Sequence, residues 1–189
     1  NIDSFKFPEY TFEINSLSVL RICETVKKMN KPVKIYQAGS SEMYGNIKNK
    51  KVNENVQFNP SNPYAISKLS SFYIKKYYRE AYKMFCSNGI CFNTESPRRG
   101  KNLVTRKITK GIADILKGKE KTIKLGNLNA KRDWTHAKDA ARAIWLILQQ
   151  KNPDDYVIAS GEEHSIREFI ELAFKETGIK IGWKGSGFG

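Results

Sequence analysis

The chain contains 189 residues, of which 40% are hydrophobic and 12% aromatic, enough to build the core of one ordinary domain or of parts of two. No apolar run approaches the ~20 residues that a membrane-spanning helix needs, and the first residues lack the basic and apolar segments of a signal peptide, so we expect a soluble cytoplasmic protein without a membrane partner. The formal net charge of +14 is spread over lysine-rich, polar groups such as residues 48–51 and 117–121, which is typical of solvated faces rather than of a nucleic-acid-binding surface.

The hydrophobic pattern alternates between helical and extended periods along the whole chain. In chain order, we expect a helix at 10–29, a strand at 33–38, a helix at 64–84, a strand at 86–92, a polar loop at 93–102, a helix at 105–116, a short strand at 122–125, a helix at 137–150, a strand at 156–159 and a helix at 166–177. This alternation predicts the α/β class with a doubly wound, parallel sheet.

The cysteines do not form a recognisable framework. Cys23, Cys86 and Cys91 are odd in number, have no metal-ligand spacing and lie in apolar surroundings. We therefore expect buried, reduced thiols, and no metal site is implied.

The strand at 33–38 ends in a group of small polar residues. Gly39, Ser40, Ser41 and Glu42 follow it directly. Because a buried parallel strand presents reactive groups at its carboxyl end, this turn is a candidate active-site segment.

The helix at 64–84 begins with a clear start signal and carries a Tyr-Lys pair. Pro63 lies in its first turn, with Ser61 and Asn62 as candidate caps. Tyr64 and Lys68 are four residues apart and so share one face of the helix. A phenol with an ordinary pKa near ~10 is a poor base at neutral pH unless a nearby cation favours its ionised form, and Lys68 can supply that charge.

A second Tyr-x-x-x-Lys match is formed by Tyr44 and Lys48. Gly45 and Asn46 lie between them and predict a turn, in which this spacing no longer brings the two side chains together. Coincidence accounts for this second match.

Six segments follow one another in a specific order. They are Ser-Ser-Glu-Met-Tyr-Gly at 40–45, Asn-Pro-Tyr-Ala-Ile-Ser-Lys at 62–68, Asn-Thr-Glu-Ser-Pro-Arg-Arg-Gly at 93–100, Val-Thr-Arg-Lys-Ile-Thr at 104–109, Leu-Gly-Asn at 125–127 and Arg-Asp-Trp-Thr-His-Ala-Lys-Asp at 132–139. Together they resemble the GDP-mannose 4,6-dehydratase family of the extended short-chain dehydrogenases, from about Ser4 to about Gly185. The segments at 95–100 and 132–139 are the most diagnostic.

The resemblance implies an incomplete Rossmann-type fold. Residues 1–100 would be the C-terminal part of an NADP-binding domain and residues 101–189 a partial substrate-binding domain, with 137–160 returning to the Rossmann sheet. No strand, glycine-rich turn and helix precede Val33, and Gly185, Gly187 and Gly189 follow no such context. We therefore expect a piece of a longer protein that lacks at least two βα units, ~60 residues or more, from its front, and further residues from its end.

By the same resemblance, the enzyme converts GDP-mannose to GDP-4-keto-6-deoxymannose with NADP, and works as a homo-oligomer, a dimer or tetramer; this piece alone is expected to be inactive. Tyr64 would take the proton from the hydroxyl on carbon 4, and Lys68 would favour its ionised form and hold the nicotinamide ribose. Glu42 would be the base at carbon 5 for the elimination of water across carbons 5 and 6. Ser40 would bond the sugar, where the family more often has threonine.

Five further residues are assigned to ligands by the resemblance. Thr94 takes the place of a histidine that contacts the cofactor, which is a departure from the family pattern. Arg99 would bind the NADP phosphate or lie at a subunit interface, and a solvent-exposed arginine is the alternative. Asn93, Lys107 and Arg132 are candidates for the diphosphate of the GDP-sugar.

Three other functions stay open at this point. The chain could come from a nucleotide-sugar epimerase or reductase, against which Glu42 argues. It could instead be a basic nucleic-acid-binding module, or an inactive remnant that only binds its ligand.

Overall fold

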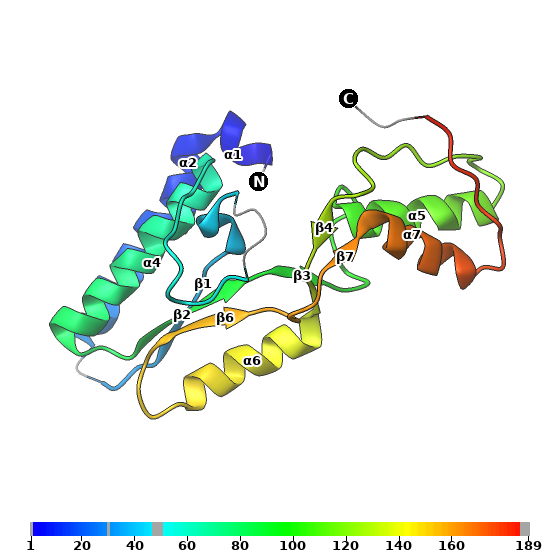
Figure 1. Cartoon of the computed structure of the whole chain (residues 1–189). Helices are drawn as coiled ribbons and strands as arrows, with labels where there is room; N and C mark the ends of the chain where they lie inside the picture. Colours follow the sequence, from blue (N-terminus) through cyan, green and yellow to red (C-terminus); the bar gives the residue numbers. More distant parts are fainter. Residues whose placement is uncertain (1, 30, 47–50, 186–189) are drawn as a thin grey trace. The chain divides into compact units, whose positions relative to one another are not determined.

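The computed structural model describes residues 2–29, 31–46 and 51–185. Lys48, Gly187 and Gly189 lie outside the described residues. The chain forms two compact units, one made of Asn1–Phe92 with Lys138–Ile158 and the other of Asn93–Ala137 with Ala159–Gly189 (Figure 1). Each unit has its own core.

The first unit is built on a three-stranded parallel sheet. Its strand order is β1 (Ile35–Ala38), β2 (Cys86–Cys91) and β6 (Asp155–Ile158). The register aligns Ala38 with Gly89, and Gly89 with Tyr156. The sheet confirms the predicted α/β class, because parallel neighbours require the crossover connections that the sequence pattern indicated.

Helices cover both faces of this sheet. On one face, α3 (Ser18–Lys28) and α4 (Pro63–Tyr82) pack on β2 through Val19, Cys23, Tyr78 and Cys86. On the other face, α6 (Ala137–Gln149) packs on β6 through a core of Ala140, Ile147 and Ile158 (Figure 1). The doubly wound arrangement follows from these two apolar layers.

The predicted helix at 10–29 is confirmed as one continuous helical stretch, which contains a π-helical turn. Preceded by α1 (Ile2–Lys6), it consists of α2 (Pro8–Phe12), a π-helical turn at Glu13–Leu17, and α3. Ser16 of this turn donates a hydrogen bond of 2.9 Å to the backbone carbonyl of Ser67 on α4. The wider turn therefore coincides with a direct contact between the two helices.

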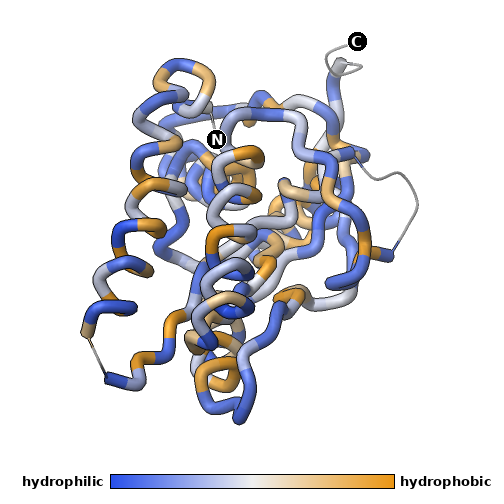
Figure 2. The backbone as a smooth tube through the Cα atoms, turned by 90° about the vertical axis from the view of Figure 1, so that its left-hand side faces the viewer, coloured by the Kyte–Doolittle hydropathy of each residue, from blue (hydrophilic) through white to orange (hydrophobic). Residues whose placement is uncertain are grey.

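The second unit pairs four short strands with two helices. Strand β3 (Asn93–Glu95) lies parallel to β5 (Trp134–His136), and β4 (Lys131–Arg132) lies antiparallel to β7 (His164–Ser165). Its core is formed between α5 (Val104–Leu116) and α7 (Ile166–Lys175) by the buried side chains of Ile108, Ile112, Ile170 and Phe174. Across the chain, hydrophobic and hydrophilic residues alternate along the helices (Figure 2).

Two predictions for this unit were wrong. The segment at 122–125 is not a strand; Ile123 and Leu125 pack against the core between α5 and α7 instead. The loop predicted at 93–102 begins with β3, which takes its hydrogen-bonding partner from β5 far along the chain.

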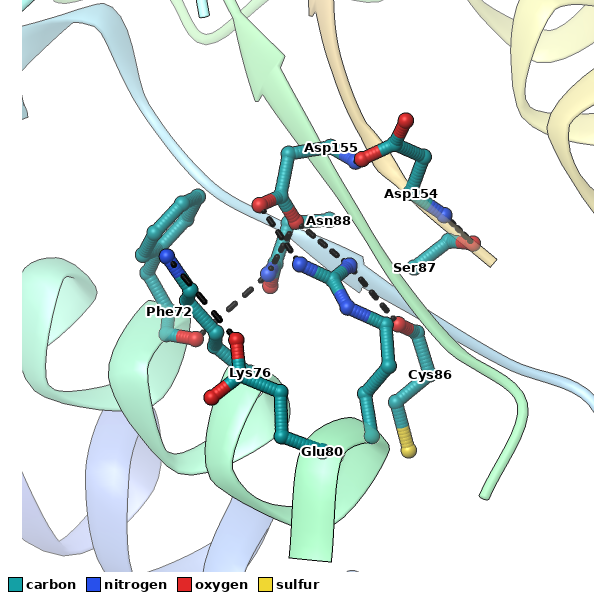
Figure 3. A network of polar contacts seen from close by, with 9 residues as sticks. Phe72, Lys76, Glu80, Cys86, Ser87, Asn88, Asp154 and Asp155 are labelled. Carbon is teal, nitrogen blue, oxygen red and sulfur yellow. Dashed lines mark hydrogen bonds and ion pairs between the residues drawn. The ribbon is translucent and has the colours of Figure 1, made fainter. Parts of the chain in front are cut away.

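A partly buried ion pair fastens α4 to the sheet of the first unit. The Arg79 guanidinium donates two hydrogen bonds of 2.8 Å to the Asp155 carboxylate on β6, and a third of 3.2 Å to the Cys86 carbonyl. The Asn88 amide donates to the same carboxylate at 2.8 Å, and Figure 3 shows Asp155 and Asn88 together in this network. One helix and two strands are thus held by paired, charge-assisted bonds.

Other sequence expectations concern cysteines, metals and membranes. All three cysteines are free thiols, with Cys23 and Cys86 buried and Cys91 partly buried. Among residues 2–29, 31–46 and 51–185, no three His, Cys, Asp or Glu side chains are grouped to hold a metal ion. No helix in the described part of the chain is both long and apolar enough to cross a bilayer.

Candidate functional site

The turn after β1 positions Ser40 and Glu42. Ser40 has an extended backbone and caps a short 3-10 helix at Ser41–Tyr44, with the Glu42 amide donating to its Oγ at 3.2 Å. Met43 and Tyr44 are almost fully buried and anchor this helix in the core of the unit. The two buried side chains therefore anchor the backbone of the turn, while the Glu42 side chain stays exposed.

Gly45 ends this turn in a conformation that other residues rarely adopt. Its φ of 70° and ψ of −149° lie in a region that is essentially restricted to glycine. A Cβ atom at this position would lie 1.9 Å from the backbone oxygen of Asn59. Glycine is thus required both for the backbone angles and for the close approach of the next segment.

Helix α4 starts at the cap that the sequence suggested. Asn62 has an extended backbone, and its Oδ1 accepts a hydrogen bond of 2.9 Å from the Ala65 amide, while Pro63 occupies the first helical turn. Tyr64 and Lys68 lie on the same face, with the Lys68 ammonium 5.7 Å from the centroid of the Tyr64 ring. This distance lies within the range at which a cation acts on an aromatic ring.

The Lys68 side chain reaches back to the strand. Its Nζ donates a hydrogen bond of 3.0 Å to the carbonyl of Ala38, the last residue of β1. Burial lowers the pKa of Lys68, and the neighbouring Cys91 opposes this effect. The cation is therefore held between the carboxyl end of β1 and the first turns of α4.

A hydrogen bond joins the turn to the helix. The Asn62 Nδ2 donates to Glu42 Oε2 at 3.0 Å. With the bond from Lys68 to Ala38, it brings Ser40, Glu42, Tyr64 and Lys68 to one end of the sheet of the first unit. Open α/β sheets bind their ligands at this end, beyond the carboxyl ends of the strands.

A pocket of about 210 Å³ lies in the second unit. It is lined by the polar or aromatic residues Asn93, Glu95, Arg99, Arg132 and Trp134 and by the apolar Leu103, Val104 and Ile166. Arg99 and Arg132 give its wall two cations, and Asn93 adds an amide. Such groups bind phosphate oxygens through charge-assisted hydrogen bonds.

Some of the N–H groups of the residues that line this pocket have no hydrogen-bond acceptor within the described residues. Arg99 Nε lies 3.3 Å from Glu95 Oε2 as an ion pair, and Thr105 Oγ1 donates to the same oxygen at 2.5 Å. Trp134 Nε1 is buried and has no hydrogen-bond acceptor within the described residues, and the buried Arg99 Nε meets Glu95 only as an ion pair, without the geometry of a hydrogen bond. Buried N–H groups without an acceptor favour a ligand that brings one.

Two residues that the sequence assigned to ligands do not line this pocket. Lys107 is exposed on α5, and Thr94 lies between Asn93 and Glu95 on β3. Conversely, the pocket contains Glu95 and Trp134, to which the sequence gave no role. Both residues lie in the segments at 95–100 and 132–139 that carry the family resemblance, and this was the feature of the sequence that could have pointed to them.

The comparisons with known proteins agree with these features. The family model described as GDP-mannose 4,6 dehydratase matches residues 2–188. The GDP-mannose 4,6 dehydratase of Dictyostelium discoideum is 50% identical over 184 residues, which cover 96% of this chain and 52% of that protein. The chain spans about half the length of the curated relatives it matches.

Solved structures show the same fold. RMD from Pseudomonas aeruginosa, complexed with NADPH, superposes with a TM-score of 0.90 at 23% identity, over 95% of this chain and 63% of that one. The dTDP-glucose 4,6-dehydratase of Bacillus anthracis, in complex with NAD, gives a TM-score of 0.80 at 25% identity, over 89% of this chain and 53% of the other. By its family match and its fold, this chain is a member of the GDP-mannose 4,6-dehydratase family.

Proposed function

We propose that this chain carries the catalytic residues of an NADP-dependent GDP-mannose 4,6-dehydratase, a hydro-lyase that yields GDP-4-keto-6-deoxymannose. The observation that carries the proposal is the grouping of Glu42 with Tyr64 and Lys68 at one end of the parallel sheet. An oxidation and an elimination need two separate bases. The Tyr64 phenol, next to the Lys68 ammonium group, is the first base, and the Glu42 carboxylate on the adjoining turn is the second.

In this proposal Tyr64 removes the proton from the hydroxyl on carbon 4 of the mannose. Lys68 lies 5.7 Å from the Tyr64 ring centroid, where its charge favours the ionised phenol. Ser40 bonds the sugar and positions it. Because Ser40 Oγ already accepts the Glu42 amide at 3.2 Å, its hydroxyl proton points elsewhere and can serve the substrate.

Glu42 removes the proton from carbon 5, so that the hydroxyl on carbon 6 leaves as water. Its exposed carboxylate is fixed at one oxygen by Asn62, and the other oxygen can accept the proton. A carboxylate on a rigid turn is well suited to this step, because proton transfer requires the base within hydrogen-bond reach of the proton.

Bound NADP would accept the hydride from carbon 4 and return it at carbon 6. Tyr64 and Lys68 fit the nicotinamide end of such a cofactor, because they lie at the carboxyl end of a parallel strand. Support also comes from the similar structures, which were solved with NADPH and NAD. We propose that the first unit is the cofactor-binding domain, and that Thr94 and Arg99, which lie in the second unit, also contact the cofactor.

Asn93, Lys107 and Arg132 are proposed to hold the diphosphate of GDP-mannose. Asn93 and Arg132 share the pocket of the second unit, which supports their assignment and that of this unit to the substrate domain. Lys107 is exposed on α5 and is free to reach a phosphate oxygen as a point charge. We also propose that the enzyme is a homo-oligomer, which sedimentation would test.

The test is product analysis with the natural protein that carries this sequence. Incubation with GDP-mannose and a trace of NADP should yield GDP-4-keto-6-deoxymannose with no net consumption of cofactor. In heavy water, deuterium should enter carbon 5, because the proton removed there is replaced from solvent. An epimerised sugar as the sole product, or a molar requirement for NADP, would contradict the proposal.

A further inference from the structure

We propose that Asn62 is a positioning residue that holds the Glu42 carboxylate in place for the elimination of water. It does so from the start of the helix that carries Tyr64. The inference rests on the proposed function, in which Glu42 is the base at carbon 5. It assigns to Asn62 a task beyond the capping of α4.

Both the oxygen and the nitrogen of the Asn62 side-chain amide form hydrogen bonds. Its Oδ1 accepts the Ala65 amide at 2.9 Å, and its Nδ2 donates to Glu42 Oε2 at 3.0 Å. This orientation is the only one that fits both neighbours. A flipped amide would set its oxygen against the carboxylate and its NH₂ group against a backbone N–H, so that both contacts would become repulsive.

Glu42 needs such an anchor because the rest of its surroundings fix only its backbone. The amide of Glu42 is bonded to Ser40 Oγ at 3.2 Å, but the side chain is exposed. An exposed glutamate samples several rotamers, and few of these bring an oxygen to the proton on carbon 5. The bond from Asn62 selects one of them, and misplacement of a catalytic group by about 1 Å can cost ~100-fold in rate.

The same residue links the two bases of the proposed reaction. Asn62 precedes Tyr64 by two residues and caps the helix on which Tyr64 and Lys68 lie. Glu42 is twenty residues away in the sequence. Because one amide joins them, the carboxylate that performs the elimination is held in register with the phenol that performs the oxidation.

The two roles of Asn62, capping α4 and holding Glu42, can be tested separately by substitution. Serine and aspartate cap helices about as well as asparagine, but neither offers an N–H donor to Glu42. Asn62→Ser should therefore keep α4 intact while releasing the carboxylate. Asn62→Asp should keep the cap and place a second negative charge against Glu42, which would drive the carboxylate away.

The experiment follows each step in the natural protein with GDP-mannose and NADP. For Asn62→Ser, we expect the initial formation of NADPH at the wild-type rate, followed by a build-up of NADPH absorbance and a loss of about 10-fold to 100-fold in product formation. Asn62→Asp should be slower than Asn62→Ser. The KM for GDP-mannose should stay unchanged, since substrate binding does not depend on the orientation of the base.

Two controls make the result specific. Ser61→Ala, next to Asn62, changes an exposed residue and should leave both steps unchanged. Thermal unfolding of the two Asn62 variants should match the wild type, because each retains a cap. If both variants lose their fold, Asn62 does more than cap and position, and the proposal is wrong.

Glu42→Gln separates failure of this inference from failure of the proposed function. If Glu42→Gln blocks elimination while Asn62→Ser and Asn62→Asp eliminate water at the normal rate, Asn62 does not position the base, although the function stands. If Glu42→Gln itself makes product normally, the function is wrong and the inference falls with it. The double variant Glu42→Gln/Asn62→Ser should be no slower than Glu42→Gln alone, and additive losses would overturn the positioning role.

Discussion

Lys68 on α4 donates a hydrogen bond of 3.0 Å to the backbone carbonyl of Ala38, the last residue of β1. The bond ties the first turns of the helix to the end of the strand from which the turn with Glu42 departs. It also holds a cation in a partly buried place, and burial lowers the pKa of Lys68. Keeping Lys68 charged in this partly buried position lowers the free energy of unfolding.

Lys68→Met should show this cost through its pH dependence. The folded-state pKa of Lys68 lies below its ordinary value of 10.5, so the protonated side chain destabilises the folded state at neutral pH. The penalty disappears as the pH rises from the lowered pKa to 10.5, where the unfolded chain also loses the proton. The free energy of unfolding of the wild type, minus that of Lys68→Met, should therefore increase as the pH rises toward 10.5.

Urea titrations of the two proteins across this pH range measure that difference. Groups that do not contact Lys68 titrate equally in both proteins and cancel, and making the comparison in a Tyr64→Phe background removes the phenol that Lys68 influences. A difference that stays constant with pH would show that Lys68 is not destabilised by its surroundings. The activity of Lys68→Met should be lost at every pH.

Tyr64→Phe should abolish the first step of the proposed reaction. Without the phenol oxygen no base starts the oxidation at carbon 4, so neither NADPH nor product should form, and the rate should fall about 100-fold to 10,000-fold. Stopped-flow absorbance and product analysis would measure both. Tyr73→Phe is the matched control, since Tyr73 lies on the same helix with 54% of its surface exposed. Normal turnover of Tyr64→Phe would remove Tyr64 from the mechanism.

The elements that position the site could be predicted from the sequence because their signals are local. Pro63 with the preceding asparagine marks the start of α4, and an apolar run followed by small polar residues marks the end of β1. Helical spacing then places Tyr64 and Lys68 on one face. These features need no knowledge of distant parts of the chain.

The elements that were mispredicted depend on distant partners. Thr122, Ile123, Lys124 and Leu125 alternate as in a strand, yet the two apolar side chains pack on helices instead of pairing with a strand in the described part of the chain. In contrast, β3 is polar and carries no strand pattern, but it pairs with β5 about forty residues later. The bond between Asn62 and Glu42 was likewise invisible, since only the folded chain brings them together.

Gly45→Ala should destabilise the turn that carries Glu42. The new Cβ would meet the Asn59 backbone oxygen at 1.9 Å, and the backbone would have to leave an angle range that is essentially restricted to glycine. Gly118→Ala is a control for the backbone angle alone, because Gly118 has a φ of +68° and a Cβ atom added there would meet none of the described residues within 4 Å. We expect a loss of about 1–2 kcal/mol for Gly118→Ala and a larger loss for Gly45→Ala.

Urea unfolding of both variants would compare these losses. Gly45→Ala should also lower the rate of elimination more than the rate of oxidation, since the displaced turn carries Glu42 rather than Tyr64. Equal losses of stability in the two variants would show that Asn59 moves aside at little cost.

The ion pair between Arg79 and Asp155 should contribute more to stability than any exposed pair on the same helix. Their side chains are only 14% and 13% exposed, and the guanidinium and carboxylate are joined by two hydrogen bonds of 2.8 Å. Arg79→Met removes both of these bonds and leaves the Asp155 carboxylate with the neutral Asn88 amide as its side-chain donor. Breaking a fully buried pair from one side costs about 3–5 kcal/mol, because the remaining charge stays uncompensated, and this partly buried pair should cost up to that amount.

The nearby pair of Lys76 and Glu80 supplies the control, and both of its residues appear in the same view (Figure 3). Its atoms are 4.0 Å apart, and its side chains are 45% and 64% exposed, so Glu80→Gln should change the free energy of unfolding by no more than about 0.5 kcal/mol. The double variant Arg79→Met/Asp155→Asn should recover part of the loss, because it removes the stranded charge together with its partner. If Arg79→Met costs no more than Glu80→Gln, the ion pair between Arg79 and Asp155 does not fasten α4 to the sheet.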